Sequence, residues 1–282
     1  MSANVIESFR SAMIESLGYA PEHIQADGIL HRFKDLKGKL NGAYVLHLDN
    51  RAAGYFECFK QGIKQTWKMT SGFIPLSDYQ RQVFKAQCQK EAEQRRIEET
   101  IRHKEAAEKA CYIWHRSTLA PKNHSYLINK RIDVNGARSG RDNTLIIPLY
   151  NTNKEIVNLQ FISETGCKRF LSGGLKKGCF YWIGGEKSEK ILICEGFATA
   201  GSLYKNSGYL TIVAFDAGNL KEVSKNIKGL QLEAEIIICG DNDLSGVGQK
   251  KAIEAAIAIN GKYIIPPIAG NDWNDSLNKE VI

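Results

Sequence analysis

Three acidic residues stand just after two short apolar runs in the second half of the chain. Glu195 directly follows ILIC, and Asp241 and Asp243 follow EIIIC after a single glycine. Runs rich in branched residues are typical of buried parallel strands, whose carboxyl ends meet at one edge of the sheet. In the extended DND segment, alternation places both aspartates on one side and Asn242 on the other. Crowded carboxylates favour a divalent cation, so we predict a Mg²⁺ or Mn²⁺ site formed by Glu195, Asp241 and Asp243.

Four further polar residues are predicted at the same edge. Asp216 and Asn219 follow the run TIVAF, and Asp272 and Asp275 follow YIIPP. We take Asn219 as a nucleotide-binding candidate and Asp275 as a metal-binding candidate. An acidic residue after a strand is also a common helix N-cap, and this alternative stays open for Glu195, Asp272 and Asp275.

A basic, glycine-rich segment, CKRFLSGGLKKG, precedes the acidic residues. Glycines in such a loop expose backbone N–H groups to phosphate, although the Walker pattern GxxxxGK[ST] is not satisfied. An ordinary solvated hairpin is the alternative interpretation. The residues predicted to bind nucleotide triphosphate and template backbone are Lys168, Arg169, Lys176 and Lys177, with Arg138 and Arg141 extending the basic track.

Charge is divided along the 282-residue chain, whose formal net charge is +7. Residues 122–178 hold ten Lys/Arg against four Asp/Glu, whereas residues 179–282 hold ten against thirteen. An acidic site that collects divalent metals beside a basic track that collects phosphates is what a nucleic-acid enzyme needs. A solvated basic face without a partner is the alternative.

The pattern of apolar residues predicts the elements that must position these side chains. A short helix over 1–20 precedes an antiparallel meander over 28–73, and a long charged helix runs from Ser77 to about Ala120. From residue 189 onward, short apolar strands alternate with helical segments, which predicts a parallel sheet with helices on its faces. The predicted divisions are a small β-rich, nucleic-acid-binding domain (1–76), a linker helix (77–121), a basic α+β subdomain (122–187) and a catalytic α/β domain (188–282).

The sequence predicts neither cysteine-based sites nor segments that enter a membrane. The seven cysteines are scattered and never two residues apart, so neither a zinc ribbon nor a disulfide framework is predicted. No apolar run approaches the length of about 18 residues needed to span a bilayer, and the first residues lack the apolar core of a signal peptide. We therefore expect a cytoplasmic protein with no membrane partner.

Several segments are similar to known primases. CEGFATAGSL, VAFDAGNL, GDNDLSGVGQKKA and NDWNDSL resemble the Toprim domain of plasmid-conjugation and satellite-phage primases, while LIIPLYN, VNLQFIS and KRFLSGGLKKG resemble the basic subdomain before it. The N-terminal DGILHRF, NGAYVLHLDN and AGYFECFKQGIKQTW are similar to the leading part of such plasmid primases.

This resemblance implies a DNA primase that joins ribonucleoside triphosphates into short RNA primers on single-stranded DNA, for replication of a plasmid, phage or other mobile element. It assigns general acid/base or metal-adjacent chemistry to Glu195 and metal binding to Asp241 and Asp243, and it adds a replicative helicase as a possible partner. A Toprim metal-dependent nuclease and a catalytically inactive DNA-binding protein remain alternatives. The zinc ribbon with which many primases begin is missing, which leaves the choice of start site unexplained.

Overall fold

The computed structural model describes residues 2–48, 52–69, 77–185, 188–231 and 233–278, with the backbone alone for residues 2, 3, 80 and 141. The chain divides into two compact units, Met1–Lys90 and Glu91–Ile282. Within the described ranges, no helix is both long enough and apolar enough to cross a bilayer.

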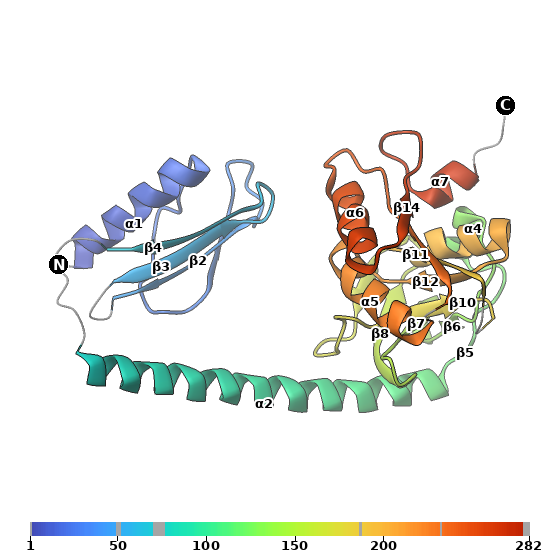
Figure 1. The fold of residues 1–282 in the computed structure, drawn as a ribbon, viewed down its shortest axis with the longest axis horizontal. Coiled ribbons are helices and arrows are strands. Elements are labelled where there is room, and N and C mark those ends of the chain that lie inside the picture. Colours follow the sequence, from blue (N-terminus) through green and yellow to red (C-terminus); the bar gives the residue numbers. More distant parts are fainter. Residues whose placement is uncertain (1, 49–51, 70–76, 186–187, 232, 279–282) are drawn as a thin grey trace. The chain divides into compact units, whose positions relative to one another are not determined.

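The first unit contains the predicted helix and meander, and both predictions are confirmed. Helix α1 (Ser2–Leu17) lies across one face of a four-stranded antiparallel sheet in the order β1-β2-β3-β4 (Figure 1). Phe9 and Met13 of α1 are fully buried against Phe56 of the sheet. The strands are β1 (His31–Phe33), β2 (Gly42–His47), β3 (Ala53–Cys58) and β4 (Ile63–Lys68).

The long helix predicted between the two halves is α2 (Asp78–Arg116), a 39-residue element. Its described side chains are exposed as far as Arg102, as expected for a highly charged sequence. The last part is different, because Ala110 is fully buried against Ile146 and Leu159. The end of this helix therefore belongs to the core of the second unit, and its role as a linker remains a prediction.

The middle of the chain forms a five-stranded antiparallel sheet in the order β5-β6-β7-β8-β9. Its long central pair carries most of the buried residues, and this is where the sequence shows the strand-like runs TLIIPLY and IVNLQFI. The elements are β5 (Thr118–Leu119), α3 (Ser125–Lys130), β6 (Arg138–Ser139), η1 (Arg141–Asn143), β7 (Leu145–Tyr150), β8 (Ile156–Ile162) and β9 (Lys168–Phe170).

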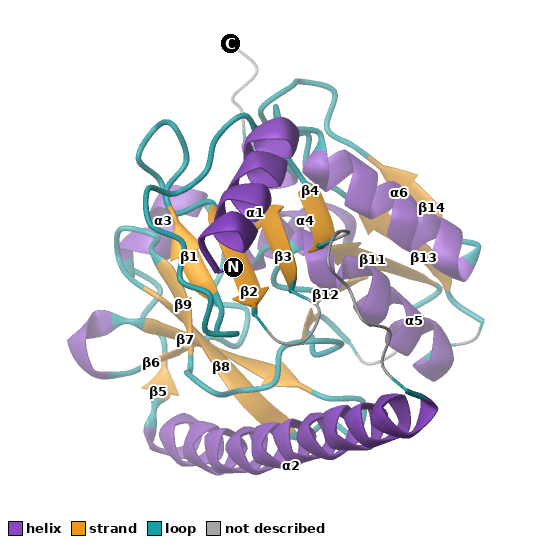
Figure 2. Cartoon of the chain, turned by 90° about the vertical axis from the view of Figure 1, so that its left-hand side faces the viewer, coloured by secondary structure: helices purple, strands orange, loops and turns teal. Residues whose placement is uncertain are grey.

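The end of the chain forms the predicted parallel sheet with helices on both faces, in the strand order β10-β12-β11-β13-β14 (Figures 1 and 2). Only β10, at one edge, runs antiparallel to its neighbour. The strands are β10 (Tyr181–Ile183), β11 (Lys190–Cys194), β12 (Leu210–Val213), β13 (Glu235–Cys239) and β14 (Lys262–Ile264). The helices are α4 (Phe197–Ser207), η2 (Ala217–Asn219), α5 (Leu220–Leu230), α6 (Val247–Ile259) and α7 (Trp273–Leu277).

Alternation along β11 gives this sheet two apolar faces. Ile191 and Ile193 lie in a cluster with residues of α5 and α6, whereas Leu192 and Cys194 lie in a second cluster with residues of α4. That second cluster also contains residues of β7 in the antiparallel sheet, so the two sheets share one core. Because β10 pairs with β12, the sheet also begins before residue 188, where the sequence analysis placed the start of the catalytic domain.

Candidate active site at the carboxyl edge of the parallel sheet

Strand register brings the acidic segments together. Cys194 lies opposite both Val213 of β12 and Cys239 of β13, so the residues after these three strands leave the sheet at the same edge. Glu195 and Asp241 are the first carboxylates after β11 and β13, and these two strands are direct neighbours. The backbone therefore places the two carboxylates on adjacent strand ends although 46 positions separate them in sequence.

The carboxylates of Glu195 and Asp241 are partly buried, and each has an oxygen without a hydrogen-bond partner. One carboxylate oxygen of each, Oε1 of Glu195 and Oδ1 of Asp241, is buried and has no hydrogen-bond partner. Burial raises the pKa of Glu195 to about 7, and the charge of Asp241 adds to this effect. Burial likewise raises the pKa of Asp241 to about 6, with the charge of Asp272 next in importance. Buried polar atoms are normally paired, so these oxygens point to a missing positive partner.

Asp243 has a different environment. Its Oδ2 accepts a hydrogen bond from the Gly248 backbone N–H at 2.6 Å, and its Oδ1 accepts bonds from the backbone and hydroxyl of Ser245. The hydrogen bond from the Ser245 hydroxyl is the main cause that lowers the pKa of Asp243. The carboxylate thus holds the turn that leads into α6, while Asn242 points elsewhere and donates to the Pro266 carbonyl at 2.7 Å.

These donors fit a magnesium or manganese ion only in part. Among the described residues, no three His, Cys, Asp or Glu side chains lie close enough together to hold a metal ion. Mg²⁺, however, is commonly bound by one or two carboxylates, with water and substrate phosphates as the remaining ligands. Two partnerless buried oxygens on neighbouring strand ends satisfy that requirement.

Two glycines at this edge differ in whether a Cβ atom would fit in their place. A Cβ at Gly240 would lie 2.5 Å from the Cβ of Ala252 and 2.8 Å from Cδ1 of Ile265, so only glycine lets α6 pack at this distance. A Cβ at Gly196 would lie 3.5 Å from the Thr199 hydroxyl, which is an ordinary contact. Close packing of α6 therefore explains why position 240 is a glycine, but it does not explain the glycine at position 196.

Lys168 brings positive charge to the carboxylates from the antiparallel sheet. Its side chain is exposed as a whole, but its ammonium lies 3.7 Å from the position that a Cβ would take at Gly196, next to Glu195. Desolvation of the ammonium, together with the charge of Lys130, lowers the pKa of Lys168, while the charges of Asp272 and Asp241 oppose this shift. The charge of Lys168 in turn opposes the rise in the pKa of Glu195.

Asn219 fastens the basic loop to the parallel sheet. It is 4% exposed, and its amide N–H groups face the carbonyls of Lys176, Cys179 and Ala214 at 2.8–3.1 Å. Its Oδ1 accepts the Gly178 N–H at 2.7 Å. These bonds leave no free N–H for a nucleotide, so the structure gives Asn219 a positioning role. This role could not be predicted from the sequence, because three of the four partner residues lie about 40 residues upstream.

The same loop carries one ion pair with the sheet edge. Lys176 Nζ lies 2.5 Å from Oδ2 of Asp216, the residue that follows β12 and the positive-φ residue Phe215. This contact is an ion pair without hydrogen-bond geometry, because Oδ2 is buried and accepts no hydrogen bond, whereas Oδ1 accepts the Asn219 backbone N–H at 2.9 Å. Lys176 therefore already has a carboxylate partner, which a bound phosphate would have to displace or share.

The other predicted basic residues are distributed unevenly. Lys177 and Arg169 are exposed, and the Arg169 guanidinium lies 5.9 Å from the Phe161 ring centroid. Arg138 instead lies over the Trp114 ring at 4.3 Å and donates to the Trp114 carbonyl at 2.6 Å, so it stabilises the end of α2. The side chain of Arg141 lies outside the described residues.

Asp272 and Asp275 form a capping box at the start of α7. The Asp272 carboxylate accepts the Asp275 N–H at 2.7 Å, and Asp275 accepts the Asp272 N–H at 3.4 Å. Asp275 also lies 4.0 Å from the Lys130 ammonium. Of the two alternatives open from the sequence, the structure shows the cap, and the metal role of Asp275 stays a prediction.

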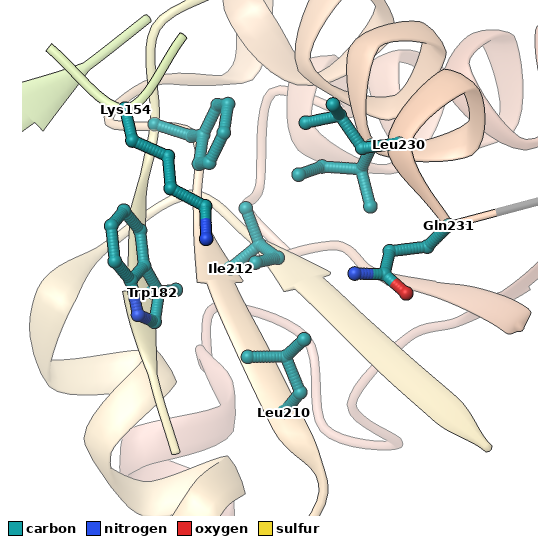
Figure 3. Close-up of a pocket in the computed structure, with 8 residues that line it drawn as sticks. Lys154, Trp182, Leu210, Ile212, Leu230 and Gln231 are labelled. Atoms are coloured by element: carbon teal, nitrogen blue, oxygen red, sulfur yellow. The ribbon is translucent and has the colours of Figure 1, made fainter. Parts of the chain in front are cut away.

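A separate apolar pocket of about 280 Å³ lies against strands β10 and β12 and helix α5 (Figure 3). Lys154 and Gln231 supply polar groups to a lining that also includes Trp182 and Ile212. Neither Glu195 nor Asp241 lines it, so this pocket is distinct from the carboxylate edge.

Comparisons with known proteins match the chain to one domain family and to two curated relatives. Residues 190–281 match the Toprim domain family. The chain is 32% identical over 268 residues to a DNA primase TraC of Escherichia coli, covering 88% of this chain and 25% of that protein. A second Escherichia coli DNA primase TraC is 32% identical over 280 residues, covering 93% of this chain and 19% of that protein. The chain thus spans a quarter or less of the length of these curated relatives.

Two solved structures were also matched with the chain, both with TM-scores below 0.5. The primase fragment of the bacteriophage T7 primase-helicase protein is 20% identical with a TM-score of 0.42, covering 54% of this chain and 67% of that chain. A DnaG primase catalytic domain bound to single-stranded DNA is 12% identical with a TM-score of 0.46, covering 64% and 77%. By sequence, residues 190–281 match the Toprim domain family, and most of the chain is similar to a part of the DNA primase TraC proteins.

Proposed function

We propose that this chain synthesises short RNA primers on single-stranded DNA by metal-dependent nucleotidyl transfer. The observation that carries the proposal is the pair of buried, partnerless oxygens of Glu195 and Asp241 on adjacent strand ends, with the Lys168 ammonium beside them. The relationship to curated DNA primases supports the same reaction class. Replication of a plasmid, phage or other mobile element, with a replicative helicase as partner, is the corresponding biological setting.

Glu195 and Asp241 would hold a Mg²⁺ or Mn²⁺ ion through their unpaired oxygens. A bound ion of this kind stabilises negative charge on the attacking and leaving oxygens during in-line displacement. Glu195 would also accept the proton of the attacking 3′-hydroxyl. Asp243 would complete the site after giving up hydrogen bonds to the turn before α6, and Asp275 would do so after leaving its capping box.

Basic side chains of the antiparallel sheet, and of the loop that follows it, would bind the negatively charged triphosphate of the incoming nucleotide. Lys168 lies beside the carboxylates, and Lys177 and Arg169 are exposed on the same segment. Asn219 and the ion pair between Lys176 and Asp216 hold that segment against the sheet edge. The carboxylates and the cations are therefore fixed relative to each other before substrate arrives, which is how positioning contributes to phosphoryl transfer.

A priming assay tests the proposal. The protein is incubated with single-stranded DNA, labelled ribonucleotides and Mg²⁺ or Mn²⁺, comparing wild type with Asp241→Asn. We expect short RNA products from wild type and a loss of at least about 100-fold in the variant, as is typical when a group that stabilises transition-state charge is removed. Glu254→Gln is the matched control, because Glu254 is an acid on α6 paired with Lys251 at 2.6 Å. Equal product from wild type and Asp241→Asn would refute the assignment.

The same assay separates the alternatives. A Toprim nuclease would use these carboxylates to admit water, so the labelled template would be cut and no RNA would accumulate. A catalytically inactive DNA-binding protein would show neither product, and Asp243→Ala would leave its DNA binding unchanged. The basic loop fastened beside the carboxylates favours primer synthesis, because a growing strand and a triphosphate both need cationic contacts there.

A further inference from the structure

The sheet of the first unit has two chemically different faces. Helix α1 covers the face that carries Phe33, Tyr44 and Phe56, which are all buried (Figure 1). Strand pairing places Arg32, Ala43, Glu57 and Lys64 in one row across the opposite face, because Arg32 lies opposite Ala43, Ala43 opposite Glu57, and Glu57 opposite Lys64. Since side chains alternate along a strand, Thr66 and Lys68 lie on the same side as Lys64.

This opposite face is basic. Arg32, Lys64 and Lys68 are exposed on it, and Glu57 is the one acid on this face among the described strand residues. Along β4 the exposed residues Lys64, Thr66 and Lys68 are spaced about 7 Å apart, which sets two cations along one line. By contrast, helix α1 on the other side carries Glu7 and Glu15 with one cation, Arg10, that donates to two backbone carbonyls. The positive charge of the sheet is therefore concentrated away from α1.

Aromatic rings accompany these cations. Phe59, just after β3, is 51% exposed, and the Arg32 guanidinium lies 4.6 Å from its ring centroid. Tyr55 is partly exposed at the centre of the face, and the Lys64 ammonium lies 5.1 Å from its ring centroid. Each ring is therefore in contact with a cation of the same face.

We propose that the basic face of the first unit, made up of Arg32, Tyr55, Phe59, Lys64 and Lys68, binds single-stranded DNA. Cations that follow the backbone and aromatic rings on which bases stack are the two components of sequence-tolerant single-strand binding. Double-stranded DNA would not fit this mode, because its bases are already stacked on each other. The surface lies outside the catalytic unit and extends the proposed function, giving the template a second attachment.

Fluorescence anisotropy with the full chain and a labelled dT₂₀ oligonucleotide tests the proposal. EDTA is present and ribonucleotides are absent, so the result does not depend on catalysis. Lys64→Gln/Lys68→Gln should weaken binding at least fivefold and reduce the slope of log K against log salt by roughly 1.4, about 0.7 for each lost phosphate contact. Phe59→Leu keeps an apolar side chain but removes the ring, and should weaken binding at least about fivefold.

The matched control removes the same charge elsewhere. Lys85 and Lys90 are exposed on α2, so Lys85→Gln/Lys90→Gln should change the affinity less than twofold. Circular dichroism checks that each variant keeps the fold of wild type. Unchanged binding by both test variants, an equal loss in the control, or equal competition by duplex DNA would each overturn the proposal. Tighter binding to rU₂₀ than to dT₂₀, lost in the same variants, would overturn the assignment to DNA.

Discussion

Asp241→Asn is expected to stabilise the metal-free protein at neutral and alkaline pH, although it removes a residue placed at the centre of the candidate site. Folding raises the pKa of Asp241 from 3.8 to about 6, chiefly through burial. The carboxyl therefore binds a proton more readily in the folded than in the unfolded chain. Its contribution to stability is complete below about pH 4 and is lost as the pH rises through about 6.

The magnitude follows from the shift. About two pKa units correspond to ~3 kcal/mol, at roughly 1.4 kcal/mol per unit. Because the Asp241 side chain is partly exposed, screening by solvent reduces this figure, and we expect ~1–3 kcal/mol. In a unit of this size that corresponds to an increase in Tm of roughly 3–10 °C. Asn keeps the shape of the side chain and removes only the charge.

Thermal unfolding in EDTA, followed by circular dichroism between pH 4 and pH 8, measures the effect. The gain of Asp241→Asn over wild type should be largest at pH 8 and shrink toward zero near pH 4. Glu235→Gln, at the other end of the same strand, is the control of opposite sign: the hydrogen bond from Lys262 lowers the pKa of Glu235, so its removal should give no gain at pH 8. Adding Mg²⁺ should stabilise wild type more than Asp241→Asn. A variant no more stable than wild type at pH 8 would refute the reasoning.

Three further predictions concern packing around the site. Gly240→Ala should lower the stability by ~1–3 kcal/mol in chemical denaturation, because its Cβ would meet α6, whereas Gly196→Ala should change it by less than about 0.5 kcal/mol. Asn219→Ala should cost ~2–4 kcal/mol and speed proteolysis of the basic loop, since it removes hydrogen bonds from the Gly178 N–H and from three carbonyls, of which the Lys176 carbonyl keeps its bond from the Cys179 N–H; a loop as resistant as in wild type would contradict this role. Ala110→Asp should destabilise the second unit by more than about 2 kcal/mol in the same denaturation assay, whereas the exposed Lys109→Asp should have little effect.

The sequence predicted the elements well where a local pattern determines them. Helix α1, the meander and the parallel strands follow from apolar periodicity, and the strand ends fix where Glu195 and Asp241 lie. The role of Asp243 was harder to predict, because an acidic residue before a helix can be a metal ligand or can accept hydrogen bonds from the turn. Its bonds from Ser245 and Gly248 show the second role.

Other features could not be predicted because their causes are distant in sequence. The burial of Asn219 depends on a loop about 40 residues earlier, and the position of Arg138 depends on where α2 ends. The short strand β10 gives no sign of its direction, since three residues carry too little periodicity to distinguish a parallel from an antiparallel partner.

The core shared by the two sheets limits how the protein can be dissected. A fragment trimmed to residues 190–281, the span of the family match, would lose β7 and with it the apolar partners of Leu192, Cys194 and Phe197. That side of the fragment would meet water, which favours aggregation over a soluble monomer. The second unit is better isolated by cutting within the exposed stretch of α2, before Arg102, where none of the described side chains is buried.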